Sequence, residues 1–422
     1  VENLADTIRE AFVIAQSGRP GPVLIDVPKD VQTAKCEYEP KAPMEKEETY
    51  AAKEIRIKEA ADYINSAERP IVYFGGGLIT ANAQEEMLML ADKIDAPIGC
   101  SLRGLSAIPT DHPRFLGMHG MHGRLASFLA MYNADLIISL GVRFNDRVTG
   151  NREKFAAKAK IIHIDVDGSE LRKTVNTVCG LRGDVKLTLG KLLPLLNERK
   201  RPDWMEKTEA FRKEEEGCLD NRKGLTPRNI ILKLNQYLGE NTTVCTDVGQ
   251  HQMWSAQNLN FKTPRRFVSS GGLGTMGFGI GAAIGAAVGT HERSVLITGD
   301  GSFGMSLQEL ATAVTYNIPV VILILNNSVL GMVRQWQTLF FDKHYSNTTL
   351  NRKNDFAAVA KAFGADGEKV LTEEELDEAF IHAFNNNGPY VIDCSIDKDE
   401  FVLPMLPPGG SMDDIITKME VE

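Results

Sequence analysis

The stretch TGDGSFGMSLQELATAVTYNIPVVILILNN, residues 298–327, contains two polar corners that each follow a run of aliphatic residues. Such runs are typical of strands buried in a parallel sheet, and the residues between the corners favour a helix. The first corner is Gly299-Asp300-Gly301 and the second is Asn326-Asn327. Because neighbouring parallel strands end at the same edge of a sheet, we expect the two corners to meet there.

These corners carry the chemistry of a magnesium site. The Asp300 carboxylate and the Asn327 amide oxygen, with a main-chain carbonyl close by, are hard-oxygen ligands that leave places for phosphate oxygens. Gly299 and Gly301 let the backbone approach a ligand closely. Each corner alone is a common turn, and an unrelated pair of turns is the alternative. Together, with residues 302–325 between them, they match the thiamine diphosphate fingerprint, GDG followed by NN. We therefore predict one metal site that binds a diphosphate.

The composition limits the class of protein. With 422 residues, of which 43% are hydrophobic and 24% charged, the chain is expected to form two or three globular domains. A net charge of −9 without a basic stripe argues against nucleic acid or an anionic membrane as a partner. The six cysteines are scattered and include no CxxC pair, which is typical of buried thiols in a reducing compartment, so we expect a cytoplasmic protein.

Short aliphatic runs alternate with helical segments along most of the chain, which predicts an α/β fold with two consecutive doubly wound parallel-sheet domains. Before them, residues 1–18 favour a helix and residues 20–28, PGPVLIDVP, favour a strand, so we expect a short remnant of a domain that begins upstream. The expected units are the remnant (1–35), a linker (36–55), a central domain (56–196), a charged and solvated linker (197–224), a C-terminal domain (225–400) and a tail (401–422).

The stretch GGLGTMGFGIGAAIGAAVG, residues 271–289, has glycines every four residues from Gly277 to Gly289, as in closely packed membrane helices. It lacks bulky aliphatic residues and a basic flank, so we predict a buried helix that packs tightly on a sheet. The glycines that precede it leave main-chain N–H groups free at the helix N-terminus, which suits an anion.

Eight stretches carry a resemblance that spans the whole chain. They are SGRPGPVLIDVPKDVQ, LGMHGMHG, GVRFNDRVTG, DVGQHQMW, SSGGLGTMGFG, GDGSF, NNSVLGMVRQWQ and VLPMLPPGG. In these stretches and in their order, the chain resembles the catalytic large subunit of acetohydroxyacid synthase (acetolactate synthase), a thiamine diphosphate-dependent transferase of isoleucine and valine biosynthesis. The resemblance implies that pyruvate is decarboxylated and that the remaining two-carbon group is joined to pyruvate or 2-ketobutyrate, which gives 2-acetolactate or 2-aceto-2-hydroxybutyrate.

The resemblance also implies the cofactor contacts of the C-terminal domain. Asp300, Asn327 and the carbonyl of Val329 would hold Mg²⁺. Met276 would support thiamine diphosphate in the bent form that brings its two rings together. The other positions that match thiamine diphosphate contacts are Val248, Gly249, Gln250, His251, Gly299, Gly301, Ser302, Leu330, Gly331 and Met332.

Lys29, Arg147, Met332 and Trp336 match family positions around the substrate, next to the catalytic position of Met276. The guanidinium of Arg147 suits a substrate carboxylate because its fork pairs with two oxygens. Trp336 would supply an apolar wall that favours an ethyl over a methyl group on the second substrate. Catabolic acetolactate synthases typically lack this tryptophan, so it indicates the biosynthetic kind. Taken without the family, Trp336 could be a core aromatic residue.

The central domain resembles the FAD-binding domain of this family. FAD is therefore expected, with a structural role, because the net reaction transfers no electrons. Asn145 stands where many members have aspartate, so that contact is left open. The matching positions are Arg19 from the remnant and Gly75, Gly76, Ser101, Leu102, Met118, His119, Gly141, Arg143, Arg147, Val148, Asp165, Val166, Asp184 and Val185.

One departure from the family is large. The glutamate that activates the cofactor lies near the start of a pyrimidine-binding domain, and neither Glu2 nor Glu10 matches it. We expect most of that domain to precede residue 1, and we expect the chain alone to have little or no synthase activity. By resemblance, the protein forms a homodimer or tetramer with shared sites and can bind a regulatory small subunit.

Two other functions are kept as alternatives. The first is another thiamine diphosphate-dependent carboligase or decarboxylase, such as a glyoxylate carboligase, against which the motif GMVRQWQ argues. The second is a non-catalytic fragment that binds a cofactor or a regulatory subunit. The tail motif VLPMLPPGG is interpreted either as a lid over the site or as a plain surface loop.

Overall fold

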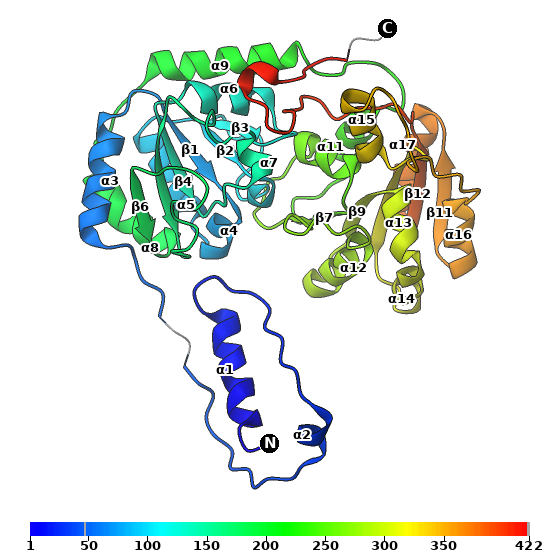
Figure 1. Ribbon diagram of the computed structural model, residues 1–422. Helices are drawn as coiled ribbons and strands as arrows, with labels where there is room; N and C mark the ends of the chain where they lie inside the picture. The colour runs from blue at the N-terminus through cyan, green and yellow to red at the C-terminus, as the bar shows by residue number, and fades with distance from the viewer. Residues whose placement is uncertain (46–47, 420–422) are drawn as a thin grey trace.

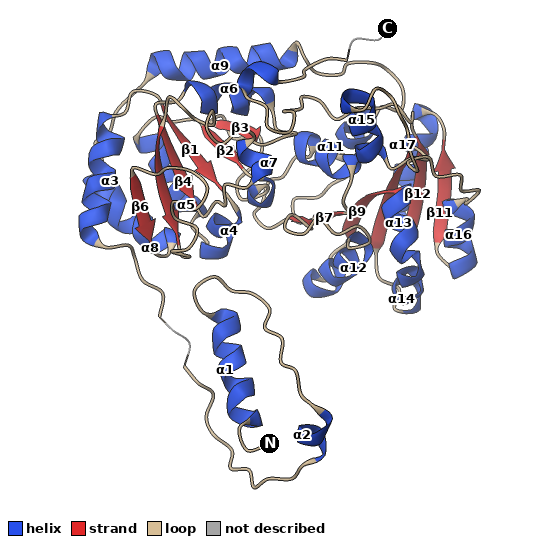
Figure 2. Ribbon diagram, viewed as in Figure 1, coloured by secondary structure: helices blue, strands red, loops and turns tan. Residues whose placement is uncertain are grey.

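The computed structural model describes residues 1–45 and 48–419 and contains two parallel sheets of six strands each, which confirms the predicted fold class (Figure 1). The two sheets lie side by side, and helices lie against each of them (Figure 2). Each sheet and its helices form a doubly wound α/β unit.

The first sheet has the strand order β3-β2-β1-β4-β5-β6. This is the order of dinucleotide-binding sheets, in which the ligand crevice opens between the first and fourth strands. The strands are β1 (Pro70–Phe74), β2 (Ile98–Cys100), β3 (Phe115–Met118), β4 (Leu136–Leu140), β5 (Lys160–Asp165) and β6 (Cys179–Arg182). The helices are α3 (Glu54–Ser66), α4 (Gly76–Ala81), α5 (Gln84–Lys93), α6 (Leu125–Asn133), α7 (Asp146–Thr149), α8 (Val185–Leu192) and α9 (Pro202–Glu216), with 3-10 turns at Leu102–Gly104 and Leu193–Leu195.

Alternate residues of β1 enter two different cores, because successive side chains of a strand point to opposite faces. Val72 and Phe74 pack in one core with residues of α3, α5 and α8. Ile71 and Tyr73 pack in the other core with residues of α6 and α9. The first sheet is thus buried on both faces, as its continuous aliphatic runs predict.

Helix α9 occupies a segment for which a solvated linker is predicted, and the structure differs from that prediction. Trp204 and Phe211 are buried against the first sheet, and Trp204 donates from Nε1 to the Pro70 carbonyl at 2.9 Å. The two aromatic residues are separated by two helical turns and therefore lie on the same face of α9. The charged residues around them conceal this narrow apolar stripe in the sequence.

The second sheet has the strand order β11-β12-β10-β9-β7-β8. Its strands are β7 (Thr243–Thr246), β8 (Phe267–Ser269), β9 (Ser294–Gly299), β10 (Val320–Asn326), β11 (Asp366–Val370) and β12 (Tyr390–Ser395). Its helices are α10 (Pro227–Leu234), α11 (Gln250–Asn258), α12 (Gly279–Thr290), α13 (Asp300–Ser306), α14 (Leu310–Thr315), α15 (Gly331–Phe340), α16 (Phe356–Phe363) and α17 (Glu373–Asn385), with a 3-10 turn at Leu307–Glu309. A last 3-10 turn, Met412–Asp414, lies in the tail against α6 of the first sheet domain.

Helix α12 is the glycine-rich helix, and it is buried on one face only. Ala283 and Ala287 pack against the core of the second sheet, so its predicted contact with a sheet is confirmed. Gly281, Gly285 and Gly289 lie on the exposed face, and nothing lies within 4 Å of the position that a Cβ would take on any of them. Gly279, at the start of α12, also approaches the sheet closely, since a Cβ there would lie 2.5 Å from Cδ1 of Leu296. The predicted burial therefore holds for one face of the helix only.

The first residues contain α1 (Leu4–Gln16) and α2 (Lys29–Thr33), and Figure 1 shows both apart from the two sheets. Residues 20–28 have no strand conformation and belong to neither sheet, so the strand predicted there is wrong for this structure. A strand needs hydrogen bonds from a neighbour, and this segment has none within the described chain.

No helix in the described part of the chain combines the length and apolar composition that crossing a bilayer requires.

Candidate cofactor site

The candidate site lies where the strand order of the second sheet changes direction. The chain passes from β7 to β8 on one side, whereas β9 and β10 lie on the other side, so a crevice opens beyond the carboxyl ends of β7 and β9. Gly299 in β9 is paired with Leu325 in β10. Asp300 and Asn327 therefore follow the ends of neighbouring strands, which confirms that the two polar corners meet at one edge.

Asp300 begins α13 and is only 4% exposed. Burial raises the pKa of its carboxyl to about 6, while the N–H groups of Asp300 and Gly301 and the charge of Arg352 act in the opposite direction. Arg352 donates from Nη1 to the main-chain oxygen of Asp300 at 3.2 Å. Among the described residues, no basic group forms an ion pair with Asp300 within 4.0 Å. A buried carboxylate without a cationic partner fits a metal ion, which would balance its charge.

Asn327 is buried, and both ends of its amide have partners. Its Nδ2 donates to Oε1 of Gln250 at 3.2 Å, and its Oδ1 accepts from the N–H of Val329 at 3.2 Å. The amide oxygen has a second lone pair, which remains available to a cation. Val329 also forms an antiparallel bridge with Thr349, so the turn that carries the predicted carbonyl ligand is held on both sides.

Two glycines leave room for the buried side chains of Gln250 and His251 next to the site. A Cβ on Gly331 would lie 1.9 Å from Oε1 of Gln250, so only glycine leaves room for this side chain at the start of α15. A Cβ on Gly299 would lie 3.0 Å from Nδ1 of His251. Burial lowers the pKa of His251 to about 3, and its buried Nε2 has no hydrogen-bond partner among the described residues. A neutral imidazole with a free nitrogen suits a polar ligand in the crevice.

Met276 lies beside the Asp300 corner. Its terminal methyl is 3.7 Å from the position that a Cβ would take on Gly301, and Leu330 lies 3.1 Å from that position. Ser302 closes the group by donating from its hydroxyl to the carbonyl of Val248 at 3.0 Å. The structure therefore gathers residues from three separate stretches of sequence around the Asp300 corner.

The N–H groups that precede α12 are occupied by a residue of the protein itself. Asp247, which follows β7, accepts from the N–H of Gly277 at 2.8 Å and of Gly279 at 3.3 Å. The anion expected at this helix N-terminus is thus the Asp247 carboxylate, and this bond fixes the loop that carries Met276. Asp247 was missed in the sequence, although it follows a buried strand in the same way as Asp300.

Arg147 and Trp336 come from different sheet domains and meet in the structure. The guanidinium carbon of Arg147, on α7, lies 5.8 Å from the ring centroid of Trp336, on α15. Met332, one turn before Trp336, packs on the edge of a core of the second sheet. Lys29 does not join them: it is exposed at the start of α2, which Figure 1 shows far from α15.

The tail contains a buried segment, residues 400–406, which we call the strap. Trp254 donates from Nε1 to the carbonyl of Phe401 at 3.2 Å, and the N–H of Leu406 donates to the carbonyl of Met121 at 2.7 Å. Val402 is fully buried. Since Trp254 belongs to the second sheet domain and Met121 to the first, the strap runs between the two domains, and its interpretation as a surface loop is wrong.

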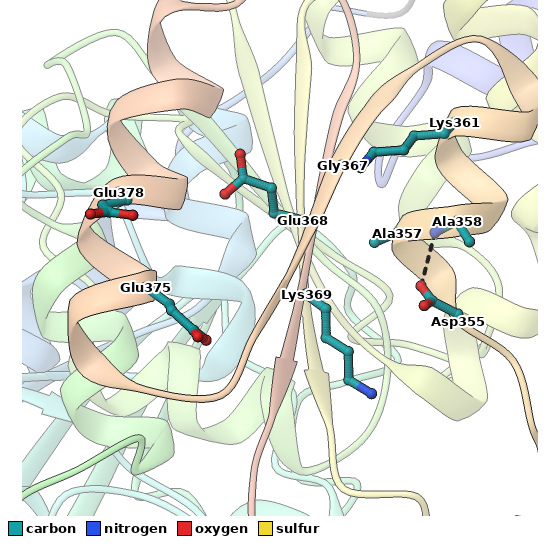
Figure 3. A pocket seen from close by; sticks show the side chains of 9 residues that line it. All are labelled: Asp355, Ala357, Ala358, Lys361, Gly367, Glu368, Lys369, Glu375 and Glu378. Atoms are coloured by element: carbon teal, nitrogen blue, oxygen red, sulfur yellow. Dashed lines mark hydrogen bonds between the residues drawn. The ribbon is translucent and has the colours of Figure 1, made fainter.

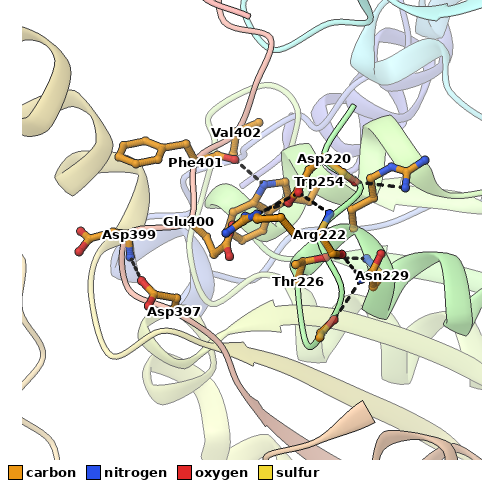
Figure 4. Close-up of polar contacts among 12 residues, drawn as sticks. Asp220, Arg222, Thr226, Asn229, Trp254, Asp397, Asp399, Glu400, Phe401 and Val402 are labelled. Carbon is orange, nitrogen blue, oxygen red and sulfur yellow. Dashed lines mark hydrogen bonds and ion pairs between the residues drawn. The ribbon is translucent and has the colours of Figure 1, made fainter. Parts of the chain in front are cut away.

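An acidic and basic cluster fixes the start of the strap (Figure 4). Arg222 contacts Glu400 at 2.7 Å and Asp220 at 2.8 Å. Burial raises the pKa of Glu400, while Arg222 acts in the opposite direction. The segment before α10 is therefore attached to the strap, close to the point where the Glu400 carbonyl accepts from Gln250 at 2.8 Å.

In the central domain, the loops after β1 and β4 touch at the crevice of the first sheet. The N–H of Gly77 donates to the carbonyl of Gly141 at 3.1 Å, and a Cβ on Gly75 would lie 2.5 Å from that carbonyl. These glycines are therefore needed for the close approach of two loops. The other predicted FAD positions of this domain lie at or just beyond the carboxyl ends of its strands or in the first turn of the following helices: Gly76, Ser101, Leu102, Met118, His119, Arg143, Arg147, Val148, Asp165, Val166, Asp184 and Val185.

Arg19 and Asn145 also take places near this edge. The charge of Arg19 helps to lower the pKa of Asp167, just beyond β5, although the Ser169 hydroxyl is the larger cause. Asn145 is the N-cap of α7 and accepts from the N–H of Val148 at 3.2 Å. An aspartate would accept the same bond, so the departure at Asn145 preserves the local structure.

A surface depression of about 420 Å³ lies elsewhere, beside the edge strand β11 (Figure 3). It is lined by side chains of both charges, among them Lys361, Lys369 and Glu375. Strands β12 and β10 separate β11 from β9 in the sheet order. This depression is therefore separate from the crevice at Asp300.

Comparison with known proteins agrees with this geometry. Residues 247–394 match the thiamine pyrophosphate enzyme C-terminal TPP binding domain, and residues 57–192 match the thiamine pyrophosphate enzyme central domain. The acetolactate synthase isozyme 2 large subunit of Escherichia coli is 40% identical over 99% of this chain and 76% of its own length. The acetolactate synthase large subunit of Haemophilus influenzae is 39% identical over 98% and 75%, and the mitochondrial acetolactate synthase catalytic subunit of Saccharomyces cerevisiae is 40% identical over 99% and 64%.

Proposed function

Because this chain belongs to the family of acetolactate synthase large subunits, which are thiamine pyrophosphate enzymes, we propose that it acts in the synthesis of acetolactate from pyruvate. The observation that carries the proposal is the buried, unpaired carboxylate of Asp300 beside Asn327, inside the segment that matches a TPP binding domain. The biosynthetic products are 2-acetolactate and, with 2-ketobutyrate as second substrate, 2-aceto-2-hydroxybutyrate.

The residues present fit the two groups that such an enzyme needs. Mg²⁺ would be held by Asp300, Asn327 and the main-chain carbonyl of Val329, all hard-oxygen donors. The thiamine pyrophosphate would lie between the His251 side and the Met276 side of the crevice. When bound, it supplies the nucleophilic carbon and the electron sink that the loss of CO₂ from a 2-ketoacid requires.

The side chains of the protein would bind and orient the substrates. Arg147 lies over the ring of Trp336, and its guanidinium suits the carboxylate of a 2-ketoacid. The indole of Trp336 offers apolar area to the alkyl group of the second substrate. The strap, which contacts Trp254 of α11 and Gln335 of α15, would keep water from the side of the site that these helices cover.

We further propose that FAD binds at the crevice of the first sheet, whose strand order is that of dinucleotide-binding folds. A cytoplasmic location is supported by the six cysteines, which are all free thiols. The relatives named above are called large or catalytic subunits, so a regulatory small subunit is a proposed partner, and a homodimer or tetramer is the proposed assembly.

Another thiamine pyrophosphate-dependent carboligase is the second candidate. The contact of Arg147 with Trp336 favours acetolactate synthesis, because it places a group that can bind a substrate carboxylate next to an apolar side chain that can face the alkyl group of the second substrate.

Calorimetry with Mg²⁺ and thiamine pyrophosphate tests the site directly. We expect Asp300→Ala to abolish magnesium-dependent binding of the cofactor, whereas Asp62→Ala, at an exposed position of α3, should bind as the unchanged protein does. Unaltered affinity in Asp300→Ala would refute the proposed site.

A further inference from the structure

We propose that Gln335 is a positioning residue for the cation site, and that it joins the strap to the metal ligand Asn327 through Gln250. This inference rests on the proposed function, because it takes Asn327 to be a ligand of Mg²⁺. It adds a residue that touches neither the metal nor the substrate in the proposed function, and it makes the strap part of the site.

The connection consists of three buried amides in a row. Nδ2 of Asn327 donates to Oε1 of Gln250 at 3.2 Å, and Nε2 of Gln250 donates to Oε1 of Gln335 at 3.0 Å. Gln335 is 1% exposed and Gln250 is 4% exposed. Water cannot replace these bonds without opening the structure, so each amide depends on the next for its partners.

Gln335 is held by the strap on both of its polar atoms. Its Oε1 also accepts from the N–H of Val402 at 2.9 Å, and its Nε2 donates to the carbonyl of Val402 at 3.1 Å. The second N–H of the same group points to the Met405 sulfur at 3.4 Å. This pairing resembles one step of a sheet, in which the side chain of Gln335 takes the place of a neighbouring strand.

These bonds determine which way each amide points. Nε2 of Gln250 faces two acceptors, Oε1 of Gln335 and the carbonyl of Glu400 at 2.8 Å. Oε1 of Gln250 must therefore face Asn327, which in turn must present its NH₂ group to Gln250. The Oδ1 of Asn327 is left on the side of Val329, whose carbonyl is the third proposed ligand. A flip of any one amide would place two donors or two acceptors in contact.

Two consequences follow for the protein in solution. Loss of the Gln335 amide should weaken cation binding, because partners behind metal ligands typically change metal affinity about 10- to 100-fold. Conversely, cation binding should tighten the strap, since coupling between two sites is reciprocal. A residue that served only to pack α15 would change stability without either effect.

The test compares Gln335→Met with Gln252→Met in the full chain. Gln252 lies on α11, is 5% exposed, and donates its amide to the Ser269 hydroxyl at 2.7 Å, away from Asn327. Calorimetry with thiamine pyrophosphate in excess would measure Mg²⁺ affinity, and hydrogen exchange would follow the Val402 amide with and without Mg²⁺. We expect Gln335→Met to lower the affinity about 10-fold or more and to abolish the protection of Val402 by Mg²⁺, while Gln252→Met changes neither.

If Gln335→Met does not fold, Gln335→Glu retains the acceptor for Gln250 and loses the two donated bonds to the strap. The Val402 N–H keeps its acceptor in this variant, but the carboxylate oxygen that replaces Nε2 repels the Val402 carbonyl, so a lower Mg²⁺ affinity is the expected result. Equal Mg²⁺ affinity and equal Val402 protection in the Gln335 and Gln252 variants would overturn the proposal. Asp300→Ala separates this result from a failure of the proposed function, because an unchanged affinity in Asp300→Ala means that the cation does not bind at this edge at all.

Discussion

Replacing Asp300 with asparagine is expected to stabilise the metal-free protein at pH 8 by about 3 kcal/mol. Burial is the largest reason why the pKa of this carboxyl rises from 3.8 to about 6. Each unit of difference between folded and unfolded pKa corresponds to about 1.4 kcal/mol. The ionised carboxylate therefore costs the folded state about 3 kcal/mol when no cation is bound, and asparagine removes this cost.

The difference between the two proteins should depend on pH in a definite direction. Between about pH 4 and pH 6 the folded state keeps a proton on Asp300 that the unfolded state has lost. The free energy of unfolding therefore falls as the pH rises through this window, and it stays low above it. Asparagine does not titrate, so the stability difference should be near zero at pH 4 and fully developed at pH 8.

Thermal melting in EDTA at pH 4.5, 6 and 8 would measure this effect. For a domain of this size, about 3 kcal/mol corresponds to a rise in Tm of about 6–12 °C in Asp300→Asn at pH 8. Asp62→Asn, which changes an exposed aspartate on α3, should have the same Tm as the wild-type protein at each pH. Magnesium and thiamine pyrophosphate should raise the Tm of the unchanged protein but not of Asp300→Asn. A Tm difference that is absent at pH 8, or equal at all three values, would show that burial of this charge is not the cause.

Three other substitutions test the site, and the first of them has a matched control. Gly331→Ala should destabilise the protein by about 1–3 kcal/mol in the melting assay and lower its affinity for the cofactor in calorimetry, because the added methyl would displace Gln250. The control, Gly281→Ala on the open face of α12, should instead stabilise the protein by about 0.5–1 kcal/mol. Equal changes in stability in the two variants would contradict the steric argument. Trp336→Leu should weaken the binding of 2-ketobutyrate relative to pyruvate in calorimetry with Mg²⁺ and thiamine pyrophosphate present, and an unchanged ratio of the two affinities would count against the apolar-wall role. Arg147→Lys should weaken the binding of pyruvate about 10-fold in calorimetry with little change in Tm, since a lysine cannot pair with both carboxylate oxygens. An unaltered affinity for pyruvate would remove Arg147 from the substrate site.

The sequence predicts the sheets and the main corner of the site because both depend on local patterns. Buried parallel strands appear as short aliphatic runs, and the polar residues that end them must lie at the carboxyl edge of the sheet. Asp300 and Asn327 could be paired for this reason before any contact was known. Asp247 carries the same signal, and its missed role shows that an acidic residue after a strand can serve a helix N-terminus as well as a ligand.

Roles that depend on distant partners could not be predicted in this way. Nothing near Gln335 in the sequence indicates that it pairs with Val402, because that contact arises only when the tail passes between the two sheet domains. The strand predicted at residues 20–28 fails for a related reason, since its aliphatic run has no neighbour to bond with among the described residues. Likewise, the exposed glycine face of α12 is set by the orientation of the helix on the sheet.

The strap also has a consequence for the order in which the protein matures during synthesis. Gln250 and Asn327 leave the ribosome well before residues 400–406, and domains fold largely as they emerge. Until those later residues are present, the side chain of Gln335 cannot form its hydrogen bonds with the main chain of Val402, and the Asn327 amide loses the partner that orients it through Gln250. A released chain that ends at residue 399 still contains all six strands of the second sheet, yet we expect it to be unable to retain magnesium, so that docking of the tail acts as the last assembly step of the site.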